Sequence, residues 1–223
     1  MMKERKYTHI LFDLDGTLVN SGAGVTNAVS YALRKMGINE TDTKKLYRFL
    51  GPPLDGSFRK YYGFSPEKAK AAVVAYREYY REIGIHENEL YDGIKELLAA
   101  LKNEGFVLWV ATSKPTPFAK TILEELGILP YFSLVAGAAF DDSLNTKEKV
   151  IRHAMLLDGF SDTSRMLMVG DRFHDIEGAH ACGIHAAAVL FGFGARPEFE
   201  EYGAEYIVET PADILNICLT LNA

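Results

Sequence analysis

Carboxylates and hydroxyls follow three apolar runs of this sequence, each of which has the composition of a buried strand. In chain order, the residues that follow these runs are Asp13 and Asp15, then Thr112, Ser113 and Lys114, then Asp171 with Asp175 four residues further on. In open parallel sheets, ligands bind beyond the carboxyl ends of the strands. We therefore expect these side chains to converge on one point.

Acids gathered at one point repel each other and raise each other's pKa values unless a cation compensates them. The residues in question offer hard oxygen ligands, and the histidines and cysteines of the chain show no zinc spacing. Oxygen ligands of this kind select Mg²⁺, which binds one or two carboxylates, several waters and a substrate phosphate. The sequence therefore predicts a Mg²⁺ site.

The elements that would position these residues alternate along the chain. The predicted strands are His9–Phe12, Val107–Ala111, Met166–Val169, Ala186–Leu190 and Tyr206–Val208. Helical patterns with start signals lie between the last four: Asp92 before Gly93–Leu101, Thr116-Pro117, and Thr210-Pro211 with Asp213. Strands alternating with helices indicate parallel βαβ units, and continuous apolar strands indicate a sheet covered on both faces. The predicted fold class is α/β with a Rossmann-like parallel sheet.

About ninety residues separate the first predicted strand from the second, where one crossover helix would suffice. Residues 20–87 show helical periodicity, including an apolar stripe behind the start signal Ser65-Pro66. The stripe consists of Ala69, Ala72, Val73, Tyr76, Tyr80 and Ile83. We therefore predict an all-helical cap domain at 20–87, inserted into an α/β core domain made of 1–19 and 88–223. Hinges are expected near Asn20–Gly24 and His86–Leu90.

The charge, the cysteines and the hydropathy of the chain exclude several classes of protein. The chain of 223 residues has a net charge of −6 and a sequence pI near 5.6, which argues against a nucleic-acid-binding protein. Cys182 and Cys218 lie in apolar segments far apart in the sequence, so buried free thiols are expected. The chain has no signal-peptide pattern and no apolar run long enough to span a membrane. A cytoplasmic protein that contacts neither nucleic acid nor membrane is the expectation.

Several motifs together resemble the haloacid dehalogenase superfamily, in its phosphatase branch with a helical cap inserted after the first motif. They are F-D-L-D-G-T-L at residues 12–18, the apolar strand ending in Thr112, a lysine before a helix, and the G-D-x-x-x-D pattern of Asp171 and Asp175. Within the superfamily, the segments from Arg48 to Phe58, T-S-K-P and G-D-R-F-H-D-I-E-G-A look closest to phosphoglycolate phosphatases and bacterial 5′-nucleotidases.

The resemblance implies a role for each matching residue. Asp13 would be the nucleophile that forms an aspartyl phosphate, and Asp15 would protonate the leaving alkoxide and then deprotonate the hydrolytic water. The Asp15 backbone carbonyl would join Asp13 and Asp171 around Mg²⁺, with Asp175 supporting the site directly or through the loop backbone. Asp175 could also be an ordinary N-cap of a helix that begins at Ile176, and both roles can hold together.

The resemblance also implies a phosphate site. Gly16 would permit close backbone approach, Thr17 would order the loop, and Thr112 with the Ser113 backbone N–H would hold a phosphate oxygen. For the charge-neutralising lysine the segment N-T-K-E-K-V-I offers two candidates, and Lys147 fits better than Lys149. Lys114 is a third candidate, expected to be a loop residue near the substrate.

In the cap, residues 48–58 with the turn Gly51-Pro52-Pro53 are the expected specificity loop, in which Arg48 could pair with an anionic leaving group. The predicted function is a Mg²⁺-dependent phosphatase, monomeric or homodimeric, that hydrolyses a small phosphorylated metabolite of the phosphoglycolate or nucleotide type. A sugar phosphomutase on the same scaffold and a non-catalytic protein that binds phosphorylated ligands are the alternatives.

Overall fold

The computed structural model describes residues 5–51, 53–139 and 143–219. The described residues form two compact units. Those of Met1–Val19 and Leu90–Ala223 make up one, which we call the core unit; those of Asn20–Glu89 make up the other, which we call the inserted unit. The sequence-based boundaries lay at 19/20 and 87/88.

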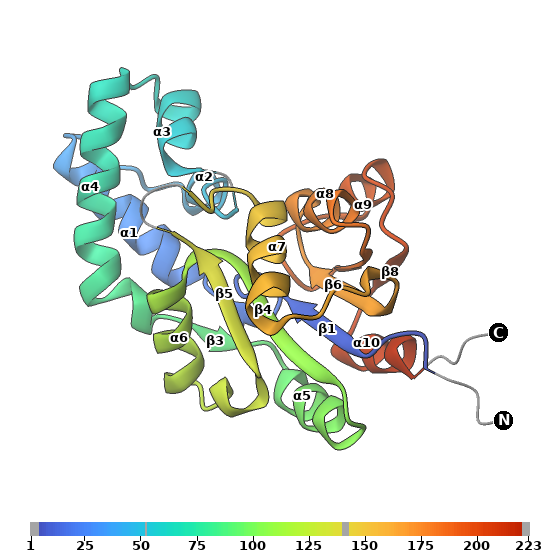
Figure 1. The fold of residues 1–223 in the computed structure, drawn as a ribbon. Coiled ribbons are helices and arrows are strands. Elements are labelled where there is room, and N and C mark those ends of the chain that lie inside the picture. The colour runs from blue at the N-terminus through green and yellow to red at the C-terminus, as the bar shows by residue number, and fades with distance from the viewer. Residues whose placement is uncertain (1–4, 52, 140–142, 220–223) are drawn as a thin grey trace, which may run out of the picture. The chain divides into compact units, whose positions relative to one another are not determined.

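The core unit is built on a parallel sheet of six strands in the order β5-β4-β1-β6-β7-β8 (Figure 1). The strands are β1 (His9–Phe12), β4 (Val107–Pro115), β5 (Leu134–Ala138), β6 (Met166–Gly170), β7 (His185–Val189) and β8 (Tyr206–Val208). In register, His9 of β1 pairs with Val107 on one side and Met166 on the other. Every residue of β1 is buried, as expected for a strand paired on both edges and covered on both faces.

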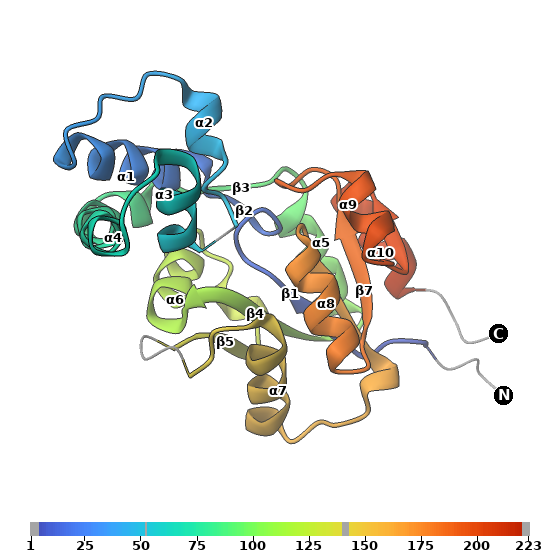
Figure 2. The ribbon, with the colours of Figure 1, turned by 90° about the horizontal axis from the view of Figure 1, so that it is seen from above.

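Helices cover both faces of this sheet (Figures 1 and 2). They are α5 (Ile94–Asn103), α6 (Thr116–Glu125), α7 (Lys147–Asp158), α8 (Phe173–Ala181), α9 (Arg196–Glu201) and α10 (Pro211–Cys218), with the short turns η2 (Leu129–Tyr131) and η3 (Thr163–Arg165). Helices α7 and α8 pack against each other; α7 also packs against β4 and β5, and α8 against β6 and β7, whereas α10 packs against α5. The predicted α/β class with a covered parallel sheet is confirmed.

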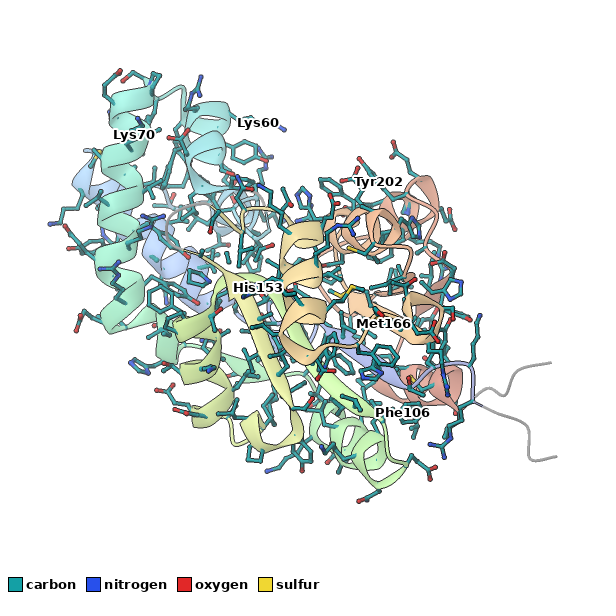
Figure 3. The ribbon with its side chains drawn as sticks, in the orientation of Figure 1. Lys60, Lys70, Phe106, His153, Met166 and Tyr202 are labelled. Atoms are coloured by element: carbon teal, nitrogen blue, oxygen red, sulfur yellow. The ribbon has the colours of Figure 1, made fainter. Side chains whose placement is uncertain are left out.

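The face under α7 and α8 holds a large part of the core. Trp109, Ile151, Met166 and Met168 are fully buried there, and Figure 3 labels Met166 at the start of β6 and His153 on α7. Burying a side chain of this size stabilises the fold by roughly 1.5–3 kcal/mol. This packing fixes the strands whose ends carry the candidate site residues. Cys182 and Cys218 are both buried and free, as predicted.

Two strands differ from the sequence prediction. Strand β5 was missed, because its small residues L-V-A-G-A give a weak apolar signal and, at the edge of the sheet, it is only partly buried. Strand β4 continues past Ala111 to Pro115, with a register irregularity between Thr112 and Pro115. Lys114 was expected in a loop, but because β4 extends to Pro115 it is a strand residue.

The helix start signals were only partly right. Thr210 caps α10 and exchanges hydrogen bonds with Asp213, as expected. Helix α5 instead begins after Gly93, whose φ of +84° is a left-handed value that suits glycine, so Asp92 is not its cap. Pro115 precedes α6, and Thr116 uses its hydroxyl to accept a hydrogen bond from the Gly137 N–H at 2.9 Å.

The inserted unit is helical, as predicted. It contains α1 (Gly22–Lys35), α2 (Thr43–Tyr47), α3 (Leu54–Tyr62), α4 (Pro66–Glu82) and the turn η1 (Gly84–His86). Ser65 caps α4 by accepting a hydrogen bond from the Lys68 N–H at 3.2 Å. The apolar stripe of α4 is buried at Ala69, Ala72, Tyr76 and Tyr80, but Ile83, which lies beyond the last helical turn, is 48% exposed.

Of the expected specificity loop at 48–58, residues 48–51 and 53 are non-helical, and the second half is helix because α3 already begins at Leu54; Pro52 lies outside the described residues. Where the chain passes between the two units, the two-residue strands β2 (Val19–Asn20) and β3 (Glu89–Leu90) pair with each other. Across the described parts of the chain, no helix is both long and apolar enough to cross a membrane.

Candidate active site

The carboxyl ends of β1, β4 and β6 bring the predicted site residues of the core unit together. Asp13 directly follows β1, and its N–H donates to the Val169 carbonyl at 2.9 Å, which extends the β1–β6 pairing by one residue. Asp171 directly follows β6, and Thr112 lies in β4. Because β1 lies between β4 and β6, these three positions are neighbours.

Lys147 is the basic residue of this cluster. It is the first residue of α7, next to the N-cap Thr146, and it is 4% exposed. Its Nζ lies 2.8 Å from Oδ1 of Asp13 and 2.7 Å from Oδ1 of Asp175, and it donates a hydrogen bond to the Ala111 carbonyl at 2.9 Å. Lys149, the alternative candidate, is exposed and donates to Asn145 at 3.0 Å. Of the two lysines, the structure brings Lys147 to Asp13.

Burial and charge perturb both partners of the Lys147–Asp13 pair. Burial raises the pKa of Asp13 to about 6, and the nearby carboxylates of Asp175 and Asp15 add to this rise, while Lys147 opposes it. Burial alone would lower the pKa of Lys147, but Asp13 and Asp175 outweigh it, so this pKa lies above its ordinary value. Lys147 is therefore a fixed positive charge in the cluster.

Asp171 is fully buried, and only one of its two carboxylate oxygens has a hydrogen-bond partner among the described residues. Its Oδ2 accepts a hydrogen bond from the Phe193 N–H at 2.7 Å, whereas its Oδ1 has no hydrogen-bond partner among the residues that the structure describes. Burial raises the pKa of Asp171 well above its usual range, and the carboxylates of Asp175 and Asp13 raise it further. A buried carboxylate oxygen without a partner is costly unless something else binds it.

Asp175 holds the loop that carries Asp171. Its Oδ2 accepts hydrogen bonds from the N–H groups of Asp171 and Arg172, both at 3.1 Å, and its Oδ1 faces Lys147. Helix α8 begins at Phe173 after the N-cap Arg172, so Asp175 lies in the first turn. The alternative that Asp175 is the N-cap of a helix starting at Ile176 is therefore wrong.

These residues fit a divalent cation. Asp13, Asp171 and Asp175 each offer one carboxylate oxygen, and these three oxygens lie within 4.8 Å of one another. One lysine compensates three acids, and Oδ1 of Asp171 is buried and unbonded within the described chain. A cation with oxygen ligands would supply both the missing charge and the missing partner.

Asp15 stands at the more exposed side of the cluster. Its Oδ1 lies 2.7 Å from Nζ of Lys114, and the side chains of Asp15 and Lys114 are 29% and 7% exposed. The ion pair restricts the direction in which the Asp15 carboxylate points. Lys114, expected near the substrate, thus reaches the second acid of the pair.

The loop after Asp15 has a strict requirement for glycine. Gly16 has a φ of +80°, and a Cβ atom built there would lie 2.0 Å from Oδ2 of Asp171. The close approach of Gly16 is thus to a carboxylate of the site. The Gly16 N–H donates to the Val19 carbonyl at 2.8 Å, whereas the buried Thr17 hydroxyl finds no hydrogen-bond partner within the described part of the chain.

The remaining predicted residues are distributed as follows. Thr112 is buried and its Oγ1 accepts from the Lys114 N–H at 3.2 Å, while Ser113 is exposed. Arg48 belongs to the inserted unit, where its guanidinium carbon lies 5.8 Å from the centre of the Tyr61 ring. The roles predicted for Thr112, Ser113 and Arg48 in binding substrate stay predictions.

Sequence reasoning missed the contacts made by the loop after β7. Phe193 contributes a backbone N–H to Asp171, and Glu198 accepts from the Phe173 N–H at 2.7 Å. One signal was present: the segment F-G-F-G at residues 191–194 places two glycines directly after a strand of the predicted sheet, at its carboxyl end.

The fold and the candidate site together indicate the class of protein to which the chain belongs. The parallel sheet is covered on both faces, and its carboxyl edge gathers aspartates, a threonine and a buried lysine. A family model described as haloacid dehalogenase-like hydrolase matches residues 10–189, and the chain belongs to this family.

Known proteins agree with this assignment. A 5′-nucleotidase of Pseudomonas aeruginosa is 42% identical over 197 residues, which cover 88% of this chain and 89% of the relative. The tyrosine-protein kinase PtkA of Mycobacterium tuberculosis is 39% identical over 205 residues, or 92% of this chain and 69% of the relative. The solved structure of a predicted phosphatase from Clostridium acetobutylicum has a TM-score of 0.87 at 43% identity and covers 94% of this chain and 99% of its own. The chain is an enzyme of the phosphatase class of this family.

Proposed function

We propose that this enzyme is a Mg²⁺-dependent phosphomonoesterase that hydrolyses a small phosphorylated metabolite through an aspartyl phosphate formed on Asp13. The observation that carries the proposal is the buried arrangement of Asp13, Lys147 and Asp171: a carboxylate at a strand end, a fixed ammonium 2.8 Å from it, and a neighbouring acid with one unbonded oxygen. Lys147 keeps Asp13 available as an anion despite its burial.

The reaction has two chemical steps. In the first, a carboxylate oxygen of Asp13 attacks phosphorus, the bond to the ester oxygen breaks, and the carboxylic acid of Asp15 donates its proton to the leaving alkoxide. In the second, the Asp15 carboxylate takes a proton from water, the resulting oxygen attacks phosphorus, and the bond to Asp13 breaks. Inorganic phosphate leaves, and both aspartates return to their starting states.

Other residues of the core unit would hold the phosphoryl group. Thr112 and the Ser113 backbone N–H are proposed to bind a non-bridging oxygen, and the Gly16 backbone is proposed to border the phosphoryl group. Asp13, Asp171, Asp175 and the Asp15 carbonyl would hold Mg²⁺, directly or through water. When bound, Mg²⁺ would offset the negative charge shared by the phosphoryl group and the carboxylates.

The substrate class is proposed to be a nucleotide-type or phosphoglycolate-type monoester. The P. aeruginosa relative named 5′-nucleotidase supports the first, and Arg48 is the candidate for recognising an anionic group of the substrate. We propose a cytoplasmic enzyme, monomeric or homodimeric, with no nucleic-acid or membrane partner; the two free thiols are in keeping with a reducing compartment.

The relative named tyrosine-protein kinase motivates a second candidate, phosphoryl transfer to a tyrosine. The two activities differ in what receives the phosphoryl group. A phosphatase gives it to water and releases inorganic phosphate, whereas a kinase consumes ATP and leaves a phosphotyrosine on a peptide.

The test is a panel of phosphorylated metabolites assayed for phosphate release with MgCl2 and with EDTA, next to ATP with a tyrosine peptide. The proposal expects metal-dependent release from at least one small monoester, without a bisphosphate activator, and loss of this release in Asp13→Asn. Peptide phosphorylation without phosphate release would favour the kinase. Phosphate release only when a sugar bisphosphate is added would indicate a phosphomutase.

A further inference from the structure

A segment outside the predicted motifs encloses Asp171. The loop after β7 and the start of α9 contribute Gly192, Phe193, Gly194 and Glu198, which we call the Asp171 clasp. Two of its contacts are hydrogen bonds, from the Phe193 N–H to Oδ2 of Asp171 and from the Phe173 N–H to Glu198. The clasp follows β7, and β7 is the neighbour of β6 in the sheet, so the clasp lies next to the loop that carries Asp171.

The clasp treats the two oxygens of Asp171 differently. Oδ2 is fixed by the Phe193 N–H at 2.7 Å, and Oδ1 is left without a hydrogen-bond partner among the described residues. Oxygens of Asp171, Asp13 and Asp175 lie within 4.8 Å of one another. A hydrogen bond to one carboxylate oxygen fixes the rotation of the group and therefore the direction of the other oxygen.

Glycine is required in the clasp by close packing. A Cβ atom on Gly192 would lie 2.4 Å from Cβ of Asp171 and 2.2 Å from the Gly16 carbonyl oxygen, and one on Gly194 would lie 2.0 Å from the Asp171 carbonyl oxygen. Gly16 borders Asp171 as well, since its own Cβ would lie 2.0 Å from Oδ2. The Asp171 side chain is therefore held between two loops that have no room for a methyl group.

Glu198 holds the same loop from its other end. Its Oε1 accepts from the Phe173 N–H at 2.7 Å and lies 3.1 Å from Nε of Arg172. Phe173 is the first residue of α8, so Glu198 satisfies a free N–H at the start of the helix that follows Asp171. Phe199, fully buried, packs against Gly194 and anchors the segment.

We infer that the Asp171 clasp is a positioning device that turns Oδ1 of Asp171 toward the metal and so sets the affinity of the site for Mg²⁺. Gly192 and Glu198 act through Asp171 and touch neither metal nor substrate. The inference rests on the proposed function, because it takes Asp171 as a metal ligand.

The test measures the apparent Kd for Mg²⁺ without substrate, from the rise in Tm over a MgCl2 titration of the full chain, together with the Tm in EDTA. Gly192→Ala and Glu198→Ala are expected to raise this Kd by about 10- to 100-fold, the usual cost of losing a group that orients a metal ligand. Glu198→Gln keeps an oxygen for the Phe173 N–H and should restore a Kd close to that of the wild type.

Two controls separate the possible failures. Gly56→Ala, on α3, adds a methyl group that meets no atom of the described residues within 4 Å and should leave the Kd unchanged. Asp171→Asn should raise the Kd most; if it does not, the proposed metal site fails and the inference fails with it.

If Asp171→Asn raises the Kd but Gly192→Ala and Glu198→Ala keep the wild-type value, the inference alone is overturned. Should Gly192→Ala fail to fold, the pair Glu198→Ala and Glu198→Gln decides. A lower Tm in EDTA with an unchanged Kd would mean that the clasp serves only the fold, which also overturns the inference.

Discussion

The ammonium nitrogen of Lys147 lies 2.8 Å from Oδ1 of Asp13, and both side chains are removed from bulk water. The same nitrogen lies 2.7 Å from Asp175. A buried charge that loses its partner is far more costly than an exposed one. The pair therefore links the stability of the core unit to the chemistry of its site.

Replacing Lys147 by Met should destabilise the protein by about 3–5 kcal/mol at neutral pH in EDTA, because buried acids lose their only close cation within the described cluster. Part of this loss should return on acidification, since protonated carboxyls no longer repel. Urea unfolding measures both effects. The matched control Lys149→Met changes an exposed lysine two residues away and should stay within about 0.5 kcal/mol of the wild type. Equal stability of Lys147→Met and wild type would contradict the role given to this pair.

Asp15→Asn should slow hydrolysis of an alkyl phosphate by about 100-fold or more, because the leaving alkoxide needs a proton. The loss should be smaller for 4-nitrophenyl phosphate, whose leaving group is a weaker base. Steady-state kinetics with the two substrates measures the difference. An equal loss on both would argue against Asp15 as the acid.

Lys114 pairs with Asp15 at 2.7 Å and is expected to orient it. Lys114→Met should therefore lower kcat in the wild-type background and cost little more in the Asp15→Asn background, as expected when two residues act as one unit. The measurement is a double-mutant cycle on kcat. Fully additive losses would show that Lys114 acts independently of Asp15.

Gly178→Ala sets two effects against each other. Gly178 lies within α8, where alanine is the better helix former by about 1 kcal/mol. A Cβ there would, however, lie 2.6 Å from Cβ of Lys147 and 3.0 Å from the Glu148 nitrogen. We expect the clash to dominate and to cost about 1–3 kcal/mol. In α3, a Cβ at Gly56 would meet no atom within 4 Å in the part of the chain that the structure describes, so Gly56→Ala should stabilise the protein by about 0.5–1 kcal/mol. Stabilisation by both changes, measured by urea unfolding, would show that α7 and α8 separate easily.

His9 should make stability depend on pH. The residue is 7% exposed, and its ring stacks on Phe160 with 3.6 Å between ring centres. Burial lowers the pKa of His9, with Arg165 adding to this and Asp158 opposing it. Because the folded-state pKa lies below the unfolded value of about 6.5, the unfolded state binds more protons as pH falls. The contribution of neutral His9 to the free energy of unfolding is therefore complete at pH values above the unfolded pKa, and it is lost progressively as the pH falls below that value.

The corresponding experiment compares the free energy of unfolding between pH 7 and pH 5 in wild type and His9→Phe, which keeps a ring against Phe160. The variant should lose less stability over this range. His86→Gln, which removes an exposed histidine, is the matched control. If the free energy of unfolding of His9→Phe fell with pH as steeply as that of the wild type, His9 would be excluded as the source of the pH dependence.

The sequence-based prediction succeeded where one residue type carries the information. The apolar run of β1, which Asp13 directly follows, and the Thr210–Asp213 cap could both be recognised from the local sequence, and the structure contains both. The prediction failed for contacts that are made by backbone groups and for residues whose identity is set by packing against distant parts of the chain. The Phe193 N–H could come from almost any residue, and the requirement for glycine at Gly192 exists only because Gly16 and Asp171, distant in sequence, lie against it.

The central claim is that Asp13 itself carries the phosphoryl group. Rapid quenching of the Mg²⁺-loaded enzyme during turnover, followed by borohydride reduction and peptide mass spectrometry, tests it directly, because reduction converts an acyl phosphate to an alcohol. The account predicts homoserine at position 13, and none at position 15 or in unreacted enzyme. Phosphate release without any modification at position 13, or continued turnover by Asp13→Asn, would contradict it.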